Sequence, residues 1–257
     1  MNTVRNILAI AGKELRSYFA SPIAYVIIGL FALLFSRFFY AYLMVFVQRS
    51  SGMMGMGGGA NNINQEMIRY VLMNSAVIIL FVMPMITMRT YSEEKRSGTI
   101  ELLLTSPLTD LEIIVGKFLG AMGLYCAMLA VTVAYMGILF FYGNPEWRPV
   151  VAGYLGLVLL GGCFISVGLF ISSLTKNQIV AGMVTFAVFL LLWIITWIGS
   201  FSGPTIDQLT QYLSITDHLD DFGKGVLDTT HLIYYLSFIT FGLFLTSKSV
   251  ESERWRG

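Results

Sequence analysis

Six long stretches of apolar residues, each nearly free of charge, constrain this chain more than any other feature of its sequence. They cover residues 22–47, 70–88, 118–142, 150–172, 178–201 and 232–247. A helix of about 20 apolar residues spans the hydrocarbon core of a bilayer and satisfies its backbone hydrogen bonds internally. Of the 257 residues, 56% are hydrophobic and only 12% are charged, which is more apolar surface than one soluble domain of this length buries. We therefore expect an all-α integral membrane protein with six transmembrane helices.

The distribution of lysine and arginine predicts how these spans are oriented. With the N-terminus in the cytoplasm, eleven basic residues fall on the inner side and four on the outer side of the membrane. The inner set is Arg5, Lys13, Arg16, Arg89, Lys95, Arg96, Lys117, Lys176, Lys248, Arg254 and Arg256, and the outer set is Arg49, Arg69, Arg148 and Lys224. Because cytoplasmic loops are enriched in basic residues, both termini are predicted to be cytoplasmic. The net charge of +1 implies no general attraction to nucleic acid.

The sequence carries no recognisable catalytic, cofactor-binding or metal-binding motif. No phosphate-binding GxxxxGK[ST] loop, HExxH, CxxC or GxSxG pattern occurs. Cys126 and Cys163 lie inside apolar stretches and are interpreted as packed free thiols. A methionine- and glycine-rich segment at residues 52–59 is interpreted as a flexible loop, with a copper site as the less favoured alternative. We therefore expect that this chain is not an enzyme and binds no cofactor or metal.

Residues 1–21 precede the first span and form a candidate amphipathic helix at the membrane interface. Its apolar residues recur at helical spacing near one face, and they are Val4, Ile7, Leu8, Ala11, Leu15 and Phe19. A basic polar face beside an apolar stripe is typical of helices that lie in the headgroup region. Such a helix either anchors the first span or also contacts a cytoplasmic partner. The remaining residues, 22–257, form one six-span domain.

The inner segment between the second and third spans, residues 89–112, is the most informative part of the chain. It contains a charged cluster followed by a glycine and an apolar helix, namely Glu93, Glu94, Lys95, Arg96, Gly98, Thr99, Ile100, Glu101, Leu102, Leu103 and Leu104. Gly98 permits a sharp turn, Thr99 is the expected cap of the short helix, and Thr109 or Asp110 is the expected cap of the next. Exposed leucines need a cover, so this helix packs on its own subunit or on the membrane surface, or docks in a groove of a soluble partner.

Two other segments carry recognisable patterns. The fourth span has small residues four positions apart, which predicts close helix packing within the subunit or across a dimer. These are Ala152 and Gly156, Gly162 and Ser166, and Gly168 and Ser172. The outer segment at residues 203–228 is acidic, and Ser214 and Thr216 can cap a helix that begins near Asp217. Its acidic residues are interpreted as a solvated face rather than as a metal or substrate site.

Several of these segments also resemble a known family. The matching stretches are Pro-Met-Ile-Thr-Met-Arg at 84–89, Ser-Glu-Glu-Lys-Arg-Ser-Gly-Thr-Ile-Glu-Leu-Leu-Leu-Thr-Ser-Pro at 92–107, and Gly-Lys-Phe at 116–118. Residues 217–226, the Gly-Lys-Glu-Leu at 12–15, Tyr18-Phe19 and Ser21-Pro22 also fit. The chain resembles, over essentially its whole length, the permease subunits of ABC-2 type transporters, and specifically their gliding-motility branch.

The resemblance implies a complex in the bacterial cytoplasmic (inner) membrane. Two permease copies, as a homodimer or with a related permease, would form a pathway, and each would dock one cytoplasmic ATPase that binds MgATP. Residues 93–106 would be the coupling helix inserted into the ATPase, and residues 1–20 the interfacial connecting helix. Residues 203–228 would form short outer re-entrant helices, with the gate candidates Asp217, Asp220, Asp221 and Phe222. An auxiliary protein with an extracytoplasmic domain is a further expected partner, besides the lipid bilayer.

The expected function is that of the membrane subunit of an ATP-driven exporter of an unidentified substrate. A secondary transporter is a second hypothesis, but the spans carry almost no ionisable residue that could relay protons or bind ions at mid-depth. A third hypothesis is a subunit that transmits force or anchors a motility or cell-envelope complex without transporting anything. The sequence does not separate the first hypothesis from the third.

Overall fold

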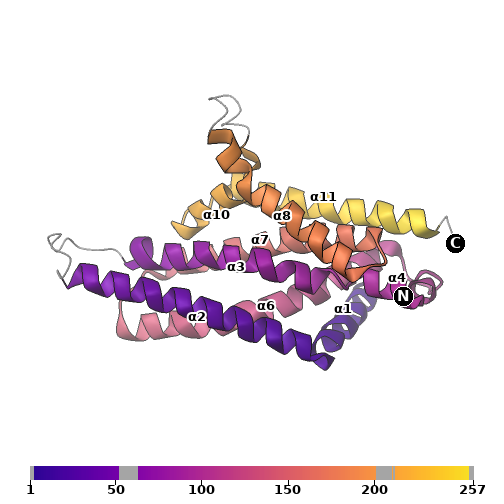
Figure 1. Cartoon of the computed structure of the whole chain (residues 1–257), viewed down its shortest axis with the longest axis horizontal. Coiled ribbons are helices and arrows are strands. Elements are labelled where there is room, and N and C mark those ends of the chain that lie inside the picture. The colour runs from indigo at the N-terminus through magenta and orange to yellow at the C-terminus, as the bar shows by residue number, and fades with distance from the viewer. Residues whose placement is uncertain (1–2, 52–62, 201–209, 211, 255–257) are drawn as a thin grey trace.

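The computed structural model describes residues 3–51, 63–200, 210 and 212–254, and every regular element in this part of the chain is a helix (Figure 1). The helices are α1 (Thr3–Ala20), α2 (Pro22–Ser50), α3 (Arg69–Thr87) with a preceding π-helical turn η1 (Asn64–Ile68), α4 (Ser92–Ser97), α5 (Thr99–Leu104), α6 (Asp110–Tyr142), α7 (Trp147–Leu174), α8 (Gln178–Ser200), α10 (Ile215–Gly223) and α11 (Thr229–Arg254). The segment at 52–59, Arg256, and residues 203–209 and 211 of the predicted outer region 203–228 lie outside the described residues.

Six of these helices are long and apolar enough to cross a membrane, which confirms the predicted fold class. They are α2, α3, α6, α7, α8 and α11. Several extend beyond the apolar stretches of the sequence: α6 begins at Asp110, and α11 continues to Arg254. The added turns carry charged residues, so these helices project past the apolar zone and bring polar side chains together at the ends of the bundle.

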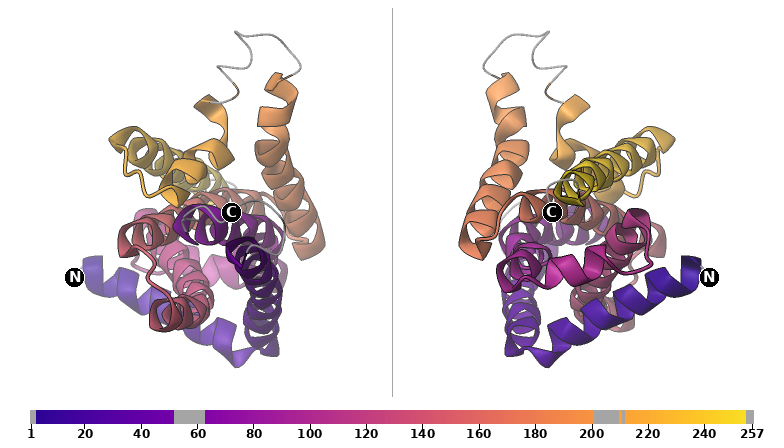
Figure 2. Two further views of the ribbon diagram at one scale, coloured as in Figure 1. Left: turned by 90° about the vertical axis from the view of Figure 1, so that its left-hand side faces the viewer. Right: turned by 90° about the vertical axis from the view of Figure 1, so that its right-hand side faces the viewer.

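The six long helices differ in how much of their apolar surface is buried within the chain. In α7, 78% of the apolar window is buried within the chain, and in α3 the value is 67%, whereas it is only 17% in α8 and α11. Figure 2 shows α8 leaning outward from the other helices. The packed core therefore lies around α7 and α3, and α2, α8 and α11 expose apolar side chains, as expected of helices that face lipid or another membrane protein.

Small residues allow α7 to contact its neighbours closely. A Cβ atom on Gly156 would lie 2.8 Å from Cβ of Phe222 in α10, and a Cβ on Gly242 of α11 would lie 2.5 Å from Oγ of Ser166. Both separations are shorter than real Cβ contacts allow. From the sequence, the small residues Gly156 and Ser166 were expected to pack either within the subunit or across a dimer. In the structure, both pack within the chain.

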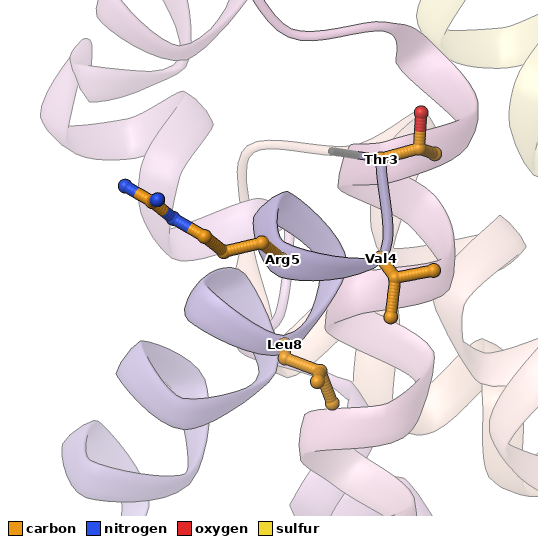
Figure 3. Close-up of a pocket in the computed structure, with 4 residues that line it drawn as sticks. All are labelled: Thr3, Val4, Arg5 and Leu8. Carbon is orange, nitrogen blue, oxygen red and sulfur yellow. The ribbon is translucent and has the colours of Figure 1, made fainter. Parts of the chain in front are cut away.

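The N-terminal helix α1 lies against the first half of α6, where glycines again permit the approach. A Cβ on Gly116 would lie 2.6 Å from Cβ of Ile10, and a Cβ on Gly120 would lie 2.6 Å from Cβ of Glu14. Part of the predicted apolar stripe stays uncovered, because Val4 and Leu8 are 69% and 61% exposed. Figure 3 shows these two side chains on one side of the first turns of α1, with the Arg5 side chain extending away from them.

Capping residues explain where several helices begin. Ser21 accepts a hydrogen bond from the backbone of Ile23 at the start of α2, and Thr109 and Glu112 form a reciprocal capping box at the start of α6. Ser214 accepts from the backbone N–H of Asp217 and begins α10. The prediction that Thr99 caps α5 is wrong, because Thr99 is the first residue of that helix and Gly98 precedes it with φ of 74° and no side-chain cap.

Candidate functional site

The short helices α4 and α5, joined at Gly98, form a helical hairpin of residues 92–104 at one end of the bundle. The start of α1 and the end of α11 lie at the same end (Figure 1). The left-handed backbone of Gly98, which favours glycine, turns the chain between the two helices. Ile100 is buried, whereas Leu102 is 73% exposed. The exposed residues of this α4–α5 hairpin are Glu93, Arg96, Ser97, Gly98, Thr99, Glu101 and Leu102.

A buried lysine of α6 connects the hairpin to two other helices. Nζ of Lys117 lies 3.0 Å from Oε1 of Glu14 in α1 and 2.8 Å from Oε1 of Glu94 in α4. It also donates a hydrogen bond of 3.0 Å to the carbonyl of Thr90, and it lies 5.0 Å from the centre of the Tyr91 ring. The Lys117 side chain is 1% exposed, so its charge is stabilised by these partners rather than by water. We call Lys117, Glu14, Glu94 and Thr90 the Lys117 cluster.

Two hydroxyl groups fix the turn between α3 and α4. Oγ of Ser172 in α7 accepts hydrogen bonds of 3.1 Å from the backbone N–H groups of Tyr91 and Ser92, and donates one of 3.0 Å to the carbonyl of Met88. From the other side, the hydroxyl of Tyr18 in α1 donates to the carbonyl of Ile86 over 3.1 Å. The beginning of the α4–α5 hairpin is therefore held to both α7 and α1.

The C-terminal end of α11 contacts the same hairpin. Nζ of Lys95 lies 2.5 Å from Oε1 of Glu253, and the Lys95 side chain is only 4% exposed. Arg254 pairs with Asp110 at the start of α6, over 3.2 Å. A polar cleft of about 730 Å³ opens between the hairpin, the α7–α8 turn at Lys176 and the end of α11. These pairs make the end of α11 part of the surface around the hairpin.

The structure divides the predicted docking residues into two groups. Glu94 and Lys95 are used in pairs within the chain, and Glu93 lies 3.2 Å from Nε of Arg89 while remaining half exposed. The others face outward apart from the buried Ile100 and the partly buried Leu103, and the side chain of Leu104 is outside the described part. Docking of a partner on this hairpin stays a prediction. The exposed apolar side chain that it would use is Leu102.

Near the opposite end of the bundle, α10 is held by ion pairs and by one aromatic side chain. Arg69, at the start of α3, donates two hydrogen bonds to the carboxylate of Asp220, over 2.8 Å and 2.7 Å. Lys224 lies 2.9 Å from Asp220 and 2.8 Å from Asp221. The Phe222 side chain is fully buried. Asp220 and Asp221 are thus paired within the chain rather than forming a freely solvated face, and the predicted gate role of these residues stays a prediction.

Asp221 also begins a row of hydrogen-bonding groups that leads through both histidines of the chain. Its Oδ2 atom lies 3.0 Å from Nε2 of His231, near the start of α11. Nδ1 of His231 lies 2.6 Å from Nδ1 of His218, in α10. Nε2 of His218 lies 3.1 Å from the carbonyl oxygen of Tyr212. We call Asp221, His231, His218 and the Tyr212 carbonyl the histidine relay.

Sequence reasoning did not find the residues that organise these two ends. Arg69 was counted only for the charge bias, Lys117 only for that bias and as part of a stretch that matches the family, and Ser172 only for its size. Their partners are remote in sequence: Glu14 precedes Lys117 by 103 positions and Asp220 follows Arg69 by 151. Among the described residues, no group of three or more His, Cys, Asp or Glu side chains is arranged to hold a metal ion.

Comparison with known proteins identifies the family. The family model described as "ABC-2 family transporter protein" matches residues 8–248, which is nearly the whole chain. A search of curated proteins gives no match. With its six apolar helices, the chain is a multi-pass membrane protein. It belongs to the ABC-2 family of transporter proteins.

Proposed function

We propose that this membrane permease is driven by a separate ATPase subunit, which docks on the α4–α5 hairpin, and that it couples MgATP binding and hydrolysis there to export. The observation that carries the proposal is an exposed apolar side chain, Leu102, on a hairpin whose first helix is held to its neighbours by ion pairs and hydrogen bonds. An exposed leucine on a short helix is suited to insert into a groove of a soluble partner. The chain has no phosphate-binding loop of its own, which supports a separate source of energy.

The contacts of the hairpin suggest how its displacement would reach the membrane helices. The Lys117 cluster connects it to α1 and α6, Ser172 connects it to α7, and the Lys95–Glu253 pair connects it to α11. Because these contacts of α4 are short and mostly buried, a push that α5 transmits to α4 would move the ends of the four helices together. Coupling energy travels through such contiguous packed contacts.

The proposed setting rests on the distribution of charge and apolar surface and on what the family resemblance implies. The α4–α5 end faces the cytoplasm of a bacterium, in the inner membrane, and α10 lies on the outer side. The exposed apolar faces of α2, α8 and α11 support contact with lipid and with a second permease copy, either identical or related. An auxiliary protein with an extracytoplasmic domain is the further proposed partner. In this complex the region around α10 would form the outer gate.

The runner-up function is force transmission or anchoring in a motility or cell-envelope complex, which would use the same hairpin without cargo. Reconstitution distinguishes the two. The permease and its ATPase, placed together in liposomes, should move an amphiphilic cargo across the bilayer in an ATP-dependent manner if the chain is an exporter. ATP hydrolysis coupled to a conformational change, with no cargo moved under any condition, would favour force transmission. Uptake driven by an ion gradient without ATP would contradict both.

The docking assignment is tested with Leu102→Asp. A charge at this exposed position should abolish co-purification of the ATPase while leaving expression and membrane insertion unchanged, because the side chain makes few contacts within its own chain. The matched control is Leu227→Asp, since Leu227 is also exposed, at 57%, but lies next to α10. The control should retain the ATPase. Normal co-purification of Leu102→Asp would contradict docking through α5. Leu103→Asp is a weaker probe, because Leu103 is partly buried.

A further inference from the structure

The histidine relay has a hydrogen-bonding pattern that fixes its number of protons. Both of its ends are acceptors: the backbone carbonyl of Tyr212 and the carboxylate of Asp221. Each terminal ring nitrogen must therefore carry a hydrogen, on Nε2 of His218 and on Nε2 of His231. The contact between the two Nδ1 atoms, at 2.6 Å, requires one more hydrogen placed between them. The three contacts together need three N–H groups.

Two neutral imidazoles supply only two N–H groups, because each neutral ring carries a single hydrogen. The relay is complete only when one ring is an imidazolium. The carboxylate of Asp221 contacts His231 directly, so the charged ring is best placed at His231, with His218 neutral and its hydrogen on Nε2. In this arrangement His231 donates to both Asp221 and His218, and His218 donates to Tyr212.

We propose that His218 and His231 form a binding site for a single proton, and that this proton holds α10 against the start of α11. The proposed coupling function does not require such a site, so each proposal can be tested independently of the other. The proton comes from the aqueous phase and remains shared between the two Nδ1 atoms. No covalent bond between heavy atoms forms or breaks.

Losing or adding a proton breaks the relay in different ways. Without the shared proton, one of the three contacts loses its hydrogen: the two Nδ1 lone pairs face each other, or the Nε2 lone pair of His231 faces the Asp221 carboxylate, or the Nε2 lone pair of His218 faces the Tyr212 carbonyl. With a second proton, two N–H groups and two positive charges meet at the Nδ1 contact. Each change replaces an attractive contact with a repulsive one. The attachment of α10 to α11 should therefore be strongest at an intermediate pH and weaken on both sides.

The charged and titratable groups around the relay are consistent with a single proton. Lys224 donates to Asp221 and lowers the pKa of that carboxyl below 3.8, so Asp221 stays ionised in mildly acidic solution. Burial lowers the pKa of His218 below its ordinary 6.5, which opposes a second proton. The other charged or titratable groups facing the two rings, from α10, α11 and the segments beside them, are Asp217, Tyr212, Asp228, Tyr234 and Tyr235.

The sign of the His218 effect follows from its lowered pKa. A histidine that is harder to protonate in the folded state stabilises that state fully above its unfolded pKa, near 6.5, and this stabilisation is lost as the pH falls through the lower folded value. The acidic limit of the relay therefore lies below 6.5. The alkaline limit is the loss of the shared proton.

The chain has only two histidines, so isotope-labelled histidine reports on this site alone. Nitrogen chemical shifts of the full chain in lipid nanodiscs should show one imidazolium and one neutral ring with hydrogen on Nε2. The titration should proceed in two steps separated by about one pH unit or more, as for strongly interacting sites. Two rings that titrate together as independent histidines, or two neutral rings throughout the neutral range, would overturn the proposal.

Variants distinguish a shared proton from an ordinary buried histidine. In His231→Gln, the remaining His218 should titrate in a single step, and in Asp221→Asn the imidazolium signal should disappear near neutral pH. After correction for the intrinsic exchange rate at each pH, the protection of the α10 amides from hydrogen exchange should be greatest between the two steps in the unmodified chain, and this maximum should be lost in both variants. Glu66→Gln, near the same end but outside the relay, should keep the maximum. A steady rise or fall of this corrected protection with pH in the unmodified chain would contradict a proton held between the two rings.

Discussion

At the scale of single residues, Lys117 decides how the hairpin end of this permease is built. A lysine that is 1% exposed is sustained only by opposite charge and hydrogen bonds, and here Glu14, Glu94 and the Thr90 carbonyl supply them. Its two carboxylate partners are themselves only 12% and 16% exposed. Removing Lys117 would leave these two poorly solvated carboxylates with only the exposed Lys13, whose Nζ lies 4.0 Å from Glu14 and 3.7 Å from Glu94.

Lys117→Met should therefore be strongly destabilising. We expect a loss of about 3–5 kcal/mol in the free energy of unfolding, the range for breaking a buried ion pair by removing one partner. Denaturant unfolding of the detergent-solubilised chain measures it. The triple variant Lys117→Met, Glu14→Gln, Glu94→Gln should recover part of the loss, because it removes the two poorly solvated carboxylates as well. Lys13→Met is the control: Lys13 pairs with the same two carboxylates but is 65% exposed, so its loss should cost under about 1 kcal/mol. Equal losses for Lys117→Met and this control would contradict the cluster.

At the scale of elements, the sequence predicted what local chemistry determines. Apolar stretches predicted the long helices, Thr109 and Ser214 predicted helix starts, and Gly98 predicted the turn between α4 and α5. Contacts between remote segments were not predictable, because nothing in the spacing along the chain relates α1 to α6 or α10 to α11. The exposed face of α5 was found in part, since a run of three leucines does not reveal which of them turns outward.

The glycines of α6 show the same limit. Gly116 and Gly120 lie four positions apart in an apolar helix, a spacing that allows close packing, but the partner they accept is α1. Sequence reasoning noted such a row only in the fourth span. The position of the hairpin relative to α1 depends on this contact, since Glu14 reaches Lys117 from the same face of α1.

A single methyl group should separate α1 from α6. In Gly120→Ala, the new Cβ would meet Cβ of Glu14 at 2.6 Å, so the helices must move apart, at a cost of about 1–3 kcal/mol. Gly137→Ala on the same helix is the matched control, because a Cβ there meets nothing within 4 Å. The control should be neutral or stabilising by up to about 1 kcal/mol, from the higher helix propensity of alanine. Unfolding measurements and protease cleavage within α1 report both effects. Equal behaviour of the two variants would contradict close packing of α1.

At the scale of the whole molecule, polar contacts concentrate at the two ends and apolar packing fills the length between them. One end contains the Lys117 cluster and the Lys95–Glu253 pair, and the other contains the Arg69–Asp220 pair and the histidine relay. The central helix α7 connects them, with Ser172 at the hairpin end and Gly156 against Phe222 of α10. Because the middle of the bundle is held mainly by apolar packing, movement of one end is expected to reach the other end through rigid helices.

The orientation of these two ends decides whether an ATPase can reach the hairpin. The bias of basic residues toward the α4–α5 end predicts that this end is cytoplasmic. Single cysteines test it in a chain whose own thiols are replaced, with Cys126→Ala and Cys163→Ala. Ser97→Cys should react with a membrane-impermeable maleimide only after spheroplasts are permeabilised. Val226→Cys, at a position that is 50% exposed beside α10, should react in intact spheroplasts. The reverse pattern would place Leu102 outside the cell, beyond the reach of any cytoplasmic ATPase, and docking at the α4–α5 hairpin would have to be abandoned.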